Sequence, residues 1–251
     1  MKNDTEKELL RLNKAIAHSG LASRRAADSM IVEGRVSVNG ETVTEPGTRI
    51  DPQKDAVRVD GSLLTLAASE QRAYFMLHKP VEVVSTAKDP QGRKTVLDLL
   101  PPALAKKRLY PVGRLDYFSE GLLLLTDDGE ITLRLTHPRY HLPKTYRVTV
   151  REKPSEAMLE TMRRGMTLAE GEKLAPVKAR QLEEHGNHIV EMTLNQGINR
   201  QIRRMCRDLG LTILRLVRIR SGPLALGTLP AGKTRELTPE EVAALKKAVG
   251  L

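Results

Sequence analysis

The stretch of the chain that decides its fold reads Pro111-Val112-Gly113-Arg114-Leu115-Asp116-Tyr117-Phe118-Ser119-Glu120-Gly121-Leu122-Leu123-Leu124-Leu125-Thr126-Asp127-Asp128-Gly129. Residues 121–126 form a short apolar run that stops at Asp-Asp-Gly, which predicts a buried strand followed by a turn. The residues before it form a glycine-flanked loop that carries Arg114 and Asp116. A carboxylate at the edge of a rigid strand can be a nucleophile or a base, although an aspartate near an arginine is more often a surface ion pair.

Strands and helices are predicted on both sides of this stretch. Residues 74–77 are a short apolar strand, and residues 144–150 alternate so that Tyr146 shares a face with two valines. Residues 200–209 predict a helix that ends at Gly210. Its core-facing stripe has i, i+3, i+4, i+7 spacing and consists of Ile202, Met205, Cys206 and Leu209. The sequence Thr238-Pro239-Glu240-Glu241 predicts the start of a last helix, because it combines a capping box with proline at the first helical position.

A smaller region precedes this larger one. Residues 12–18 predict a short helix, and Ser23 is a suitable N-cap for a second helix that ends at Gly34. Residues 36–43 alternate around Asn39-Gly40, which predicts a hairpin because both turn positions need positive φ. Residues 67–72 are small and polar and indicate a linker. We therefore expect two domains, at residues 11–68 and 73–251.

Composition restricts the classes of protein that this chain can belong to. The chain has 251 residues, a formal charge of +10 and a single cysteine. One cysteine excludes an intramolecular disulfide, argues against a cysteine-based zinc site and favours a reducing compartment. No histidine spacing suggests a metal site. The polar start of the chain predicts no signal peptide, and no apolar run is long enough to cross a bilayer. We expect a cytoplasmic protein without metal or cofactor.

Positive charge gathers in residues 196–225. Seven arginines and one aspartate occur there, and arginine is suited to phosphate forks and base stacking. The positive charge of the whole chain points to a polyanionic partner such as nucleic acid, although charge alone also fits an ordinary soluble basic protein.

The small region resembles the S4 RNA-binding domain. The resemblance rests on Leu12-Asn13-Lys14, on Gly20-Leu21-Ala22-Ser23-Arg24-Arg25-Ala26-Ala27 and on Gly34-Arg35-Val36-Ser37-Val38-Asn39-Gly40. In S4 domains a basic helical face grips structured RNA. The resemblance therefore implies RNA contacts at Lys14, Arg24, Arg25 and Arg35, which would position a substrate without acting on it.

The large region resembles the pseudouridine synthases, and in particular the bacterial ribosomal RNA branch that carries an N-terminal S4 domain. The resemblance rests on Gly-Arg-Leu-Asp followed by Ser-x-Gly-Leu-Leu-Leu-Leu-Thr, on Lys144-Thr145-Tyr146, and on Gly197-Ile198-Asn199-Arg200-Gln201-Ile202-Arg203-Arg204-Met205. These motifs occur in the family's order. The implied fold is α+β, with a mixed and largely antiparallel sheet in the catalytic domain.

The resemblance also implies a role for each matching residue. Asp116 corresponds to the family's essential aspartate, Arg114 to the arginine that helps to extrude the target base, Tyr146 to the tyrosine that packs on uracil, and Arg203 to the basic partner of the aspartate. Further RNA contacts are expected at Lys79, Arg200, Arg204 and Arg207. Three positions depart from the family's pattern, with His78 and Glu82 in place of asparagine and glycine, and Phe118 in place of a polar residue. His78 is expected to be structural.

The expected activity is the isomerisation of one uridine in ribosomal RNA, which requires no cofactor. The catalytic stretch favours the large-subunit 23S RNA over the 16S RNA. A non-catalytic, S4-type ribosome-assembly factor and an enzyme acting on transfer RNA are the alternatives. The expected partner is ribosomal RNA, as a stem-loop or an assembly intermediate, with no membrane contact, and the family favours a monomer.

If cations hold the RNA backbone, RNA affinity must depend on salt. We expect the logarithm of the association constant to fall linearly with the logarithm of salt concentration, by roughly 0.7 to 0.9 per phosphate contact. Filter binding of a ribosomal RNA fragment over a series of salt concentrations measures this slope. Affinity that does not change with salt would contradict the expectation.

Overall fold

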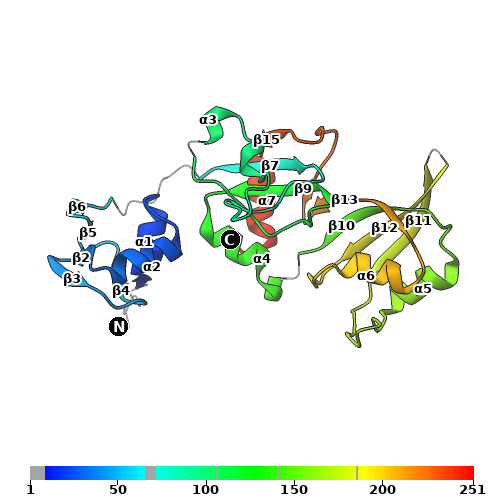
Figure 1. The fold of residues 1–251 in the computed structure, drawn as a ribbon, viewed down its shortest axis with the longest axis horizontal. Helices are drawn as coiled ribbons and strands as arrows, with labels where there is room; N and C mark the ends of the chain where they lie inside the picture. The colour runs from blue at the N-terminus through cyan, green and yellow to red at the C-terminus, as the bar shows by residue number, and fades with distance from the viewer. Residues whose placement is uncertain (1–8, 66–71, 106, 141, 185) are drawn as a thin grey trace, which may run out of the picture. The chain divides into compact units, whose positions relative to one another are not determined.

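The computed structural model describes residues 9–65, 72–105, 107–140, 142–184 and 186–251 (Figure 1). The chain divides into two compact units, with the boundary between Gln71 and Arg72. Of the predicted linker, only Arg72 is among the described residues. The last residues of the first predicted domain, 66–68, also lie outside them. No helix in the described part of the chain combines the length and apolarity needed to span a bilayer.

The first unit consists of two helices on small antiparallel sheets. Its elements are β1 (Leu10–Arg11), α1 (Leu12–His18), α2 (Arg24–Val32), β2 (Val36–Val38), β3 (Glu41–Val43), β4 (Arg49–Ile50), β5 (Val57–Val59) and β6 (Ser62–Leu63). Strands pair in the order β3-β2-β5-β6, and β1 pairs with β4. The Ser23 hydroxyl accepts a hydrogen bond from the amide of Ala26 at 3.1 Å, as expected of an N-cap. Asn39 and Gly40 have φ of 53° and 91°, which confirms the predicted hairpin turn.

The second unit is built on one large sheet. Its elements are β7 (Tyr74–Lys79), the 3-10 helix η1 (Leu97–Leu99), α3 (Pro102–Ala105), β8 (Tyr110–Pro111), β9 (Glu120–Thr126), α4 (Gly129–Thr136), η2 (Pro138–Tyr140), β10 (Lys144–Val150), α5 (Glu156–Arg164), β11 (Lys178–Glu184), β12 (Asn187–Leu194), α6 (Gln201–Asp208), β13 (Ile213–Ser221), β14 (Leu224–Ala225), β15 (Thr234–Glu236) and α7 (Pro239–Ala248). The strand order is β11-β12-β10-β13-β9-β7-β15. Among the strand pairs of this sheet, β9 with β13 is parallel and the others are antiparallel, so the predicted mixed sheet is confirmed.

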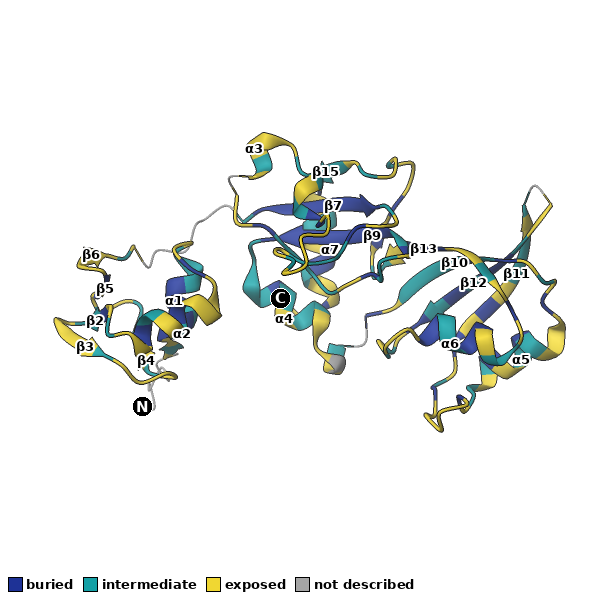
Figure 2. Cartoon of the chain, in the orientation of Figure 1, coloured by how far each residue is buried: buried dark blue, intermediate teal, exposed yellow. Residues whose placement is uncertain are grey.

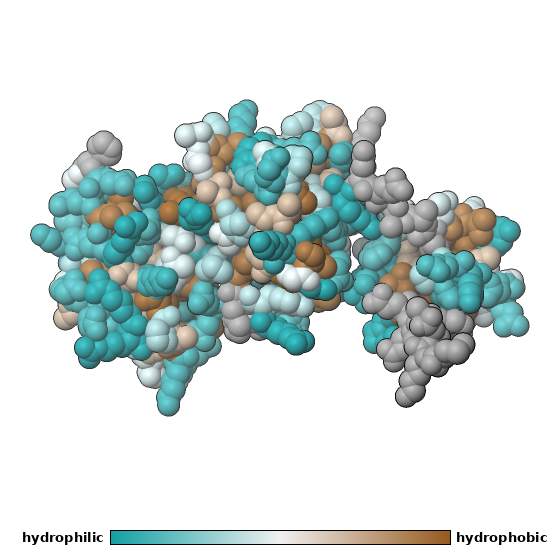
Figure 3. Space-filling model, turned by 180° about the vertical axis from the view of Figure 1, so that it is seen from behind, coloured by the Kyte–Doolittle hydropathy of each residue, from teal (hydrophilic) through white to brown (hydrophobic). Residues whose placement is uncertain are grey.

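Apolar side chains cover the two halves of this sheet separately. On one half, α5 and α6 pack against β10, β11 and β12 through residues such as Leu159, Met205 and Val190. On the other half, α4 and α7 pack on one face of β7 and β9, while loop residues including Leu115 pack on the opposite face. β7 and β9 are therefore buried on both sides, as their dark colour in Figure 2 shows. The surface in Figure 3 is mostly hydrophilic, with scattered apolar patches.

The two halves meet where β9 and β13 run side by side. The parallel register pairs Val217 with Glu120 and Arg218 with Gly121. Gly121 has φ of 110°, and a Cβ atom built there would lie 2.3 Å from the carbonyl oxygen of Arg218. Because no side chain fits at that distance, glycine is required for the two strands to approach each other. This contact holds the end of the Asp116 loop beside β13.

We expect Gly121→Ala to lower the free energy of unfolding of the second unit, and to lower it by at least about 2 kcal/mol more than the control Gly171→Ala does. Both glycines have positive φ and share that conformational cost, but a Cβ at Gly171 meets nothing within 4 Å. Urea unfolding followed by tyrosine fluorescence measures the difference, since all five tyrosines lie in the second unit. Equal free energies of unfolding for the two variants would contradict the steric account.

Candidate active site

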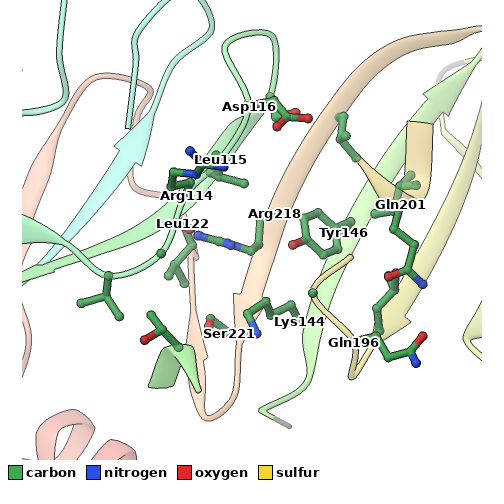
Figure 4. A pocket seen from close by; sticks show the side chains of 18 of the residues that line it. Arg114, Leu115, Asp116, Leu122, Lys144, Tyr146, Gln196, Gln201, Arg218 and Ser221 are labelled. Atoms are coloured by element: carbon green, nitrogen blue, oxygen red, sulfur yellow. Dashed lines mark hydrogen bonds between the residues drawn. The ribbon is translucent and has the colours of Figure 1, made fainter. Parts of the chain in front are cut away.

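A pocket opens in the second unit between the loop before β9, the strands β10 and β13, and the start of α6 (Figure 4). Lys144 and Tyr146 come from β10 and Arg218 from β13. Asp116 comes from the loop. Five cations line this pocket, namely Arg114, Lys144, Arg200, Arg203 and Arg218, whereas Asp116 is the one carboxylate among its described lining residues. The pocket is therefore strongly positive.

Asp116 sits in a tight turn at the edge of this pocket. Its carbonyl oxygen accepts a hydrogen bond from the amide of Ser119 at 3.0 Å, which closes the turn just before β9. Its carboxylate Oδ2 lies 3.5 Å from Nη1 of Arg200 and 3.7 Å from Nε of Arg203. The Asp116 side chain keeps 35% of its surface exposed, so a substrate can reach it.

Arg203 ties α6 to the turn that carries Asp116. Its Nη2 donates to the carbonyl oxygen of Phe118 at 2.7 Å and to the hydroxyl of Ser119 at 3.0 Å. Its buried Nε has no hydrogen-bond partner among the described residues and faces the Asp116 carboxylate. Burial, followed by the charge of Arg200, lowers the pKa of Arg203, whereas Asp116 favours its charged form. The predicted pairing of Asp116 with Arg203 is therefore present as an ionic contact, and Arg200 shares it.

Tyr146 lies on the sheet floor of the pocket. Antiparallel pairing sets it opposite Arg218 on β13 and opposite Met192 on β12. The ring is partly buried against the core under α6, and in Figure 4 it projects into the pocket between Arg218 and Gln201. A ring held in this way presents a flat surface on which a base can stack.

Comparisons with known proteins show the family of this chain. Residues 73–208 match the model of the RNA pseudouridylate synthase family, and residues 10–55 match the S4 domain model. The chain belongs to the RNA pseudouridylate synthase family. The resemblance inferred from the motifs is therefore confirmed for both domains, and so is the expectation of an enzyme of this family.

Individual relatives cover most of the chain. A protein of Bacillus subtilis (strain 168) named ribosomal large subunit pseudouridine synthase B is 43% identical over 239 residues, which are 94% of this chain and 95% of that protein. A protein of Pseudomonas aeruginosa with the same name is 40% identical over 96% of this chain and 63% of its own length. A crystal structure described as a pseudouridylate synthase is 34% identical, with a TM-score of 0.66, and covers 94% of this chain and 99% of that one.

Lys79 does not lie on the surface of this synthase domain, so the expectation that it contacts RNA is wrong. Its side chain is fully buried. Its ammonium group donates to the carbonyl oxygens of Pro80, Asp116 and Ser119 at 2.9, 3.1 and 2.8 Å. Burial lowers the pKa of Lys79 to about 8, whereas Asp116 and Glu120 favour its charged form. Lys79 thus holds the backbone of the Asp116 turn from below.

Arg204 and Arg207, where RNA contacts are expected, form ion pairs with nearby carboxylates. Arg204 pairs with Glu172 at 2.6 Å and with Glu170 at 3.2 Å, and Arg207 pairs with Glu170 and Asp208 at 2.7 Å. Neither arginine lines the pocket. Both charges are matched by carboxylates in the free protein, so an RNA contact at either position, which stays a prediction, would compete with these ion pairs.

In the S4 domain, the residues expected to contact RNA differ in their exposure and in their ion pairs. Arg24 and Arg25 are exposed in the first turn of α2, and Lys14 is partly exposed on α1. Arg35 instead forms two hydrogen bonds with Asp60, at 2.9 and 2.7 Å, and one with Glu33 at 3.1 Å. Its charge is therefore matched within the domain, and RNA contacts at all four positions stay a prediction.

Two of the three departures from the family pattern have local explanations. His78 is buried, and its Nδ1 lies 2.7 Å from the carbonyl oxygen of Leu229, which fits the expected structural role. Glu82, at a position where glycine is common, has φ of 62°, and its amide donates to the carbonyl oxygen of Tyr117 at 2.8 Å. Phe118 is 61% exposed beside the Asp116 turn.

Several pocket residues were not predicted as site residues. Lys144, Gln201 and Arg218 all line the pocket, and Gln201 is 96% buried with neither amide atom hydrogen-bonded among the described residues. Lys144 and Gln201 stand inside the quoted motifs, so the motifs themselves carried a signal. Arg218 could have been found only from the strand pairing that sets it opposite Tyr146.

We expect Lys79→Met to lower the free energy of unfolding by about 2 kcal/mol or more, because the buried carbonyl group of Ser119 and the partly buried one of Pro80 lose a charged donor. The rate of pseudouridine formation should fall as well, since the turn that carries Asp116 loses its support. The matched control is Lys178→Met on β11, which is exposed and should change stability by no more than about 0.5 kcal/mol. Urea unfolding and single-turnover kinetics measure both variants. A Lys79→Met protein with unchanged stability and rate would contradict this role.

Proposed function

We propose that this synthase converts one uridine of large-subunit ribosomal RNA to pseudouridine, with Asp116 as the nucleophile. The observation that carries the proposal is the Asp116 carboxylate in a positive pocket, 3.5 Å from Arg200 and 3.7 Å from Arg203, above the ring of Tyr146. The two guanidinium groups stabilise the negative charge of the carboxylate and orient it. An ordinary surface ion pair, the alternative interpretation of Asp116 and its arginine, would not lie in a pocket that is also lined by an aromatic ring.

Pseudouridine is an isomer of uridine, so the reaction needs neither a redox step nor a group donor. The bond between N1 of uracil and C1′ of the ribose breaks, the base turns, and a bond between C5 and C1′ forms. Asp116 attacks either C1′ or the uracil ring. In both cases it must reach a nucleotide that has left the base stack, at a cost of a few kcal/mol.

Each of the other site residues serves this everted nucleotide. Tyr146 stacks on the uracil, and Arg114, exposed at the pocket, fills the space that the base leaves in the RNA. Arg200 contacts both Asp116 and the incoming backbone. Lys14, Arg24 and Arg25 of the S4 domain bind phosphates and thereby offset the cost of eversion.

The names of the Bacillus and Pseudomonas relatives support large-subunit RNA as the substrate. The same reaction on 16S RNA or on transfer RNA remains the alternative target. Pseudouridine mapping of the ribosomal and transfer RNAs of a deletion strain, with and without the restored gene, separates these cases. A missing pseudouridine in 23S RNA supports the proposal, while a missing site in 16S RNA or in transfer RNA contradicts the substrate assignment.

Asp116→Asn tests the catalytic role against a role in RNA binding alone. We expect this variant to form no detectable pseudouridine and to bind ribosomal RNA within about threefold of the unchanged protein, because the substitution keeps shape and removes the nucleophile. Single-turnover assays and filter binding on the same RNA provide the two readouts. Unchanged pseudouridine formation would rule out Asp116 as the nucleophile, and an unchanged protein without activity on any ribosomal RNA would favour a binding factor.

A further inference from the structure

Lys144 and Arg218 form a pair of cations on the floor of the pocket that the reaction outlined above does not use. Lys144 lies two residues before Tyr146 on β10, and Arg218 lies opposite Tyr146 on β13. Residues two apart on a strand share a face, as do residues opposite each other, so both cations flank the ring on its own side of the sheet. Both side chains line the pocket; in Figure 4 Arg218 lies between Asp116 and Lys144 and extends toward Leu122, and Lys144 lies on the side away from Asp116.

No carboxylate neutralises this pair within the described residues. Arg218 is 95% buried, and its Nε donates to the carbonyl oxygen of Leu122 at 2.7 Å. Its two Nη groups donate to no acceptor in the part of the chain that the structure describes. Lys144 donates to the carbonyl oxygen of Leu142 at 3.1 Å. The charge of Asp116 is already shared by Arg200 and Arg203.

Two like charges in a buried site are unfavourable for the free protein. Burial, and then the charge of Arg218, lower the pKa of Lys144. A site that retains such charges without a counter-ion is prepared for an anion that arrives later. The bound substrate must therefore bring, or develop, negative charge at this position.

The chemistry of the reaction supplies that negative charge in the base. An everted nucleotide enters with its base foremost, so uracil reaches the floor while the phosphates stay at the mouth of the pocket. When the N1–C1′ bond breaks, its electron pair stays with the uracil, which becomes an anion with charge spread over N1, O2 and O4. After the base has turned and C5 has bonded to C1′, C5 loses its proton to a base and N1 takes up a proton, so atoms and charge balance.

We propose that Lys144 and Arg218 bind the carbonyl oxygens of the target uracil and stabilise the detached uracil anion. This inference rests on the proposed function. Because both contacts strengthen as the N1–C1′ bond breaks, they favour the transition state over the bound substrate. The hydrogen bond from Arg218 to the carbonyl oxygen of Leu122 holds its guanidinium group in place as a rigid hydrogen-bond donor. The flexible side chain of Lys144 can keep its contact with the base as the base turns.

The test compares two RNA substrates that differ in the acidity of the leaving base. With uridine at the target position, Lys144→Met and Arg218→Gln should each lower the single-turnover rate about 100-fold at saturating RNA. With 5-fluorouridine, the fluorine itself stabilises the uracil anion. Each variant should therefore lower the single-turnover rate on this substrate by only about 10-fold, compared with about 100-fold on uridine. Disappearance of the parent nucleoside, measured by chromatography after digestion of the RNA, reports both rates.

Controls separate this role from structure and from RNA binding. Arg220→Gln, on the same strand as Arg218 but exposed and outside the pocket, should leave the rate ratio between the two substrates unchanged. Arg218→Lys should recover part of the rate, and thermal unfolding should show that each variant is folded.

Three outcomes would overturn the inference. Equal losses on both substrates would indicate a structural role, and weaker RNA binding with an unchanged saturated rate would indicate a phosphate contact. Full activity in both variants would show that the pair is not needed. Failure of the proposed function is distinguished from these outcomes, since the unchanged protein would then form no pseudouridine.

Discussion

The close approach of β9 and β13 at Gly121 is the constraint on which the second unit depends. The backbone of Arg218 occupies the space that a side chain at Gly121 would need, so the two strands can run in parallel only with glycine at that position. This junction joins two sheet halves that have separate apolar cores. It also fixes where the Asp116 turn ends, because that turn leads directly into β9.

The functional geometry follows from this junction. β13, which pairs with β9 at Gly121, places Arg218 opposite Tyr146. Lys79 lies opposite Gly121 on β7, and its buried ammonium group donates to the carbonyl oxygen of Ser119 in the turn. From the other half of the sheet, α6 brings Arg200 and Arg203 to the carboxylate. A carboxylate on a turn would otherwise be mobile, but here the buried ammonium group of Lys79 and the guanidinium group of Arg203 both hold the backbone of the turn.

Local sequence signals predicted much of this architecture. The Asn39-Gly40 hairpin, the Ser23 cap and the apolar run before Asp127 were readable because each depends on neighbouring residues alone. The burial of Lys79 and the ion pairs of Arg204 were not predicted, because both depend on segments far away in the sequence. Lys79 is buried under the carbonyl of Ser119, and Arg204 pairs with Glu170 and Glu172. Arg218 was missed for the same reason, since only the pairing of β10 with β13 brings it to Tyr146.

The central claim is that Asp116, Tyr146 and the cations around them enclose one everted uridine. A crystal structure of the Asp116→Asn protein bound to its ribosomal RNA fragment measures this directly. The account predicts a flipped uracil stacked on Tyr146, with C1′ or the base within about 3.5 Å of the position 116 side chain. A target uridine that stays in the RNA stack, or that binds outside this pocket, would contradict the account.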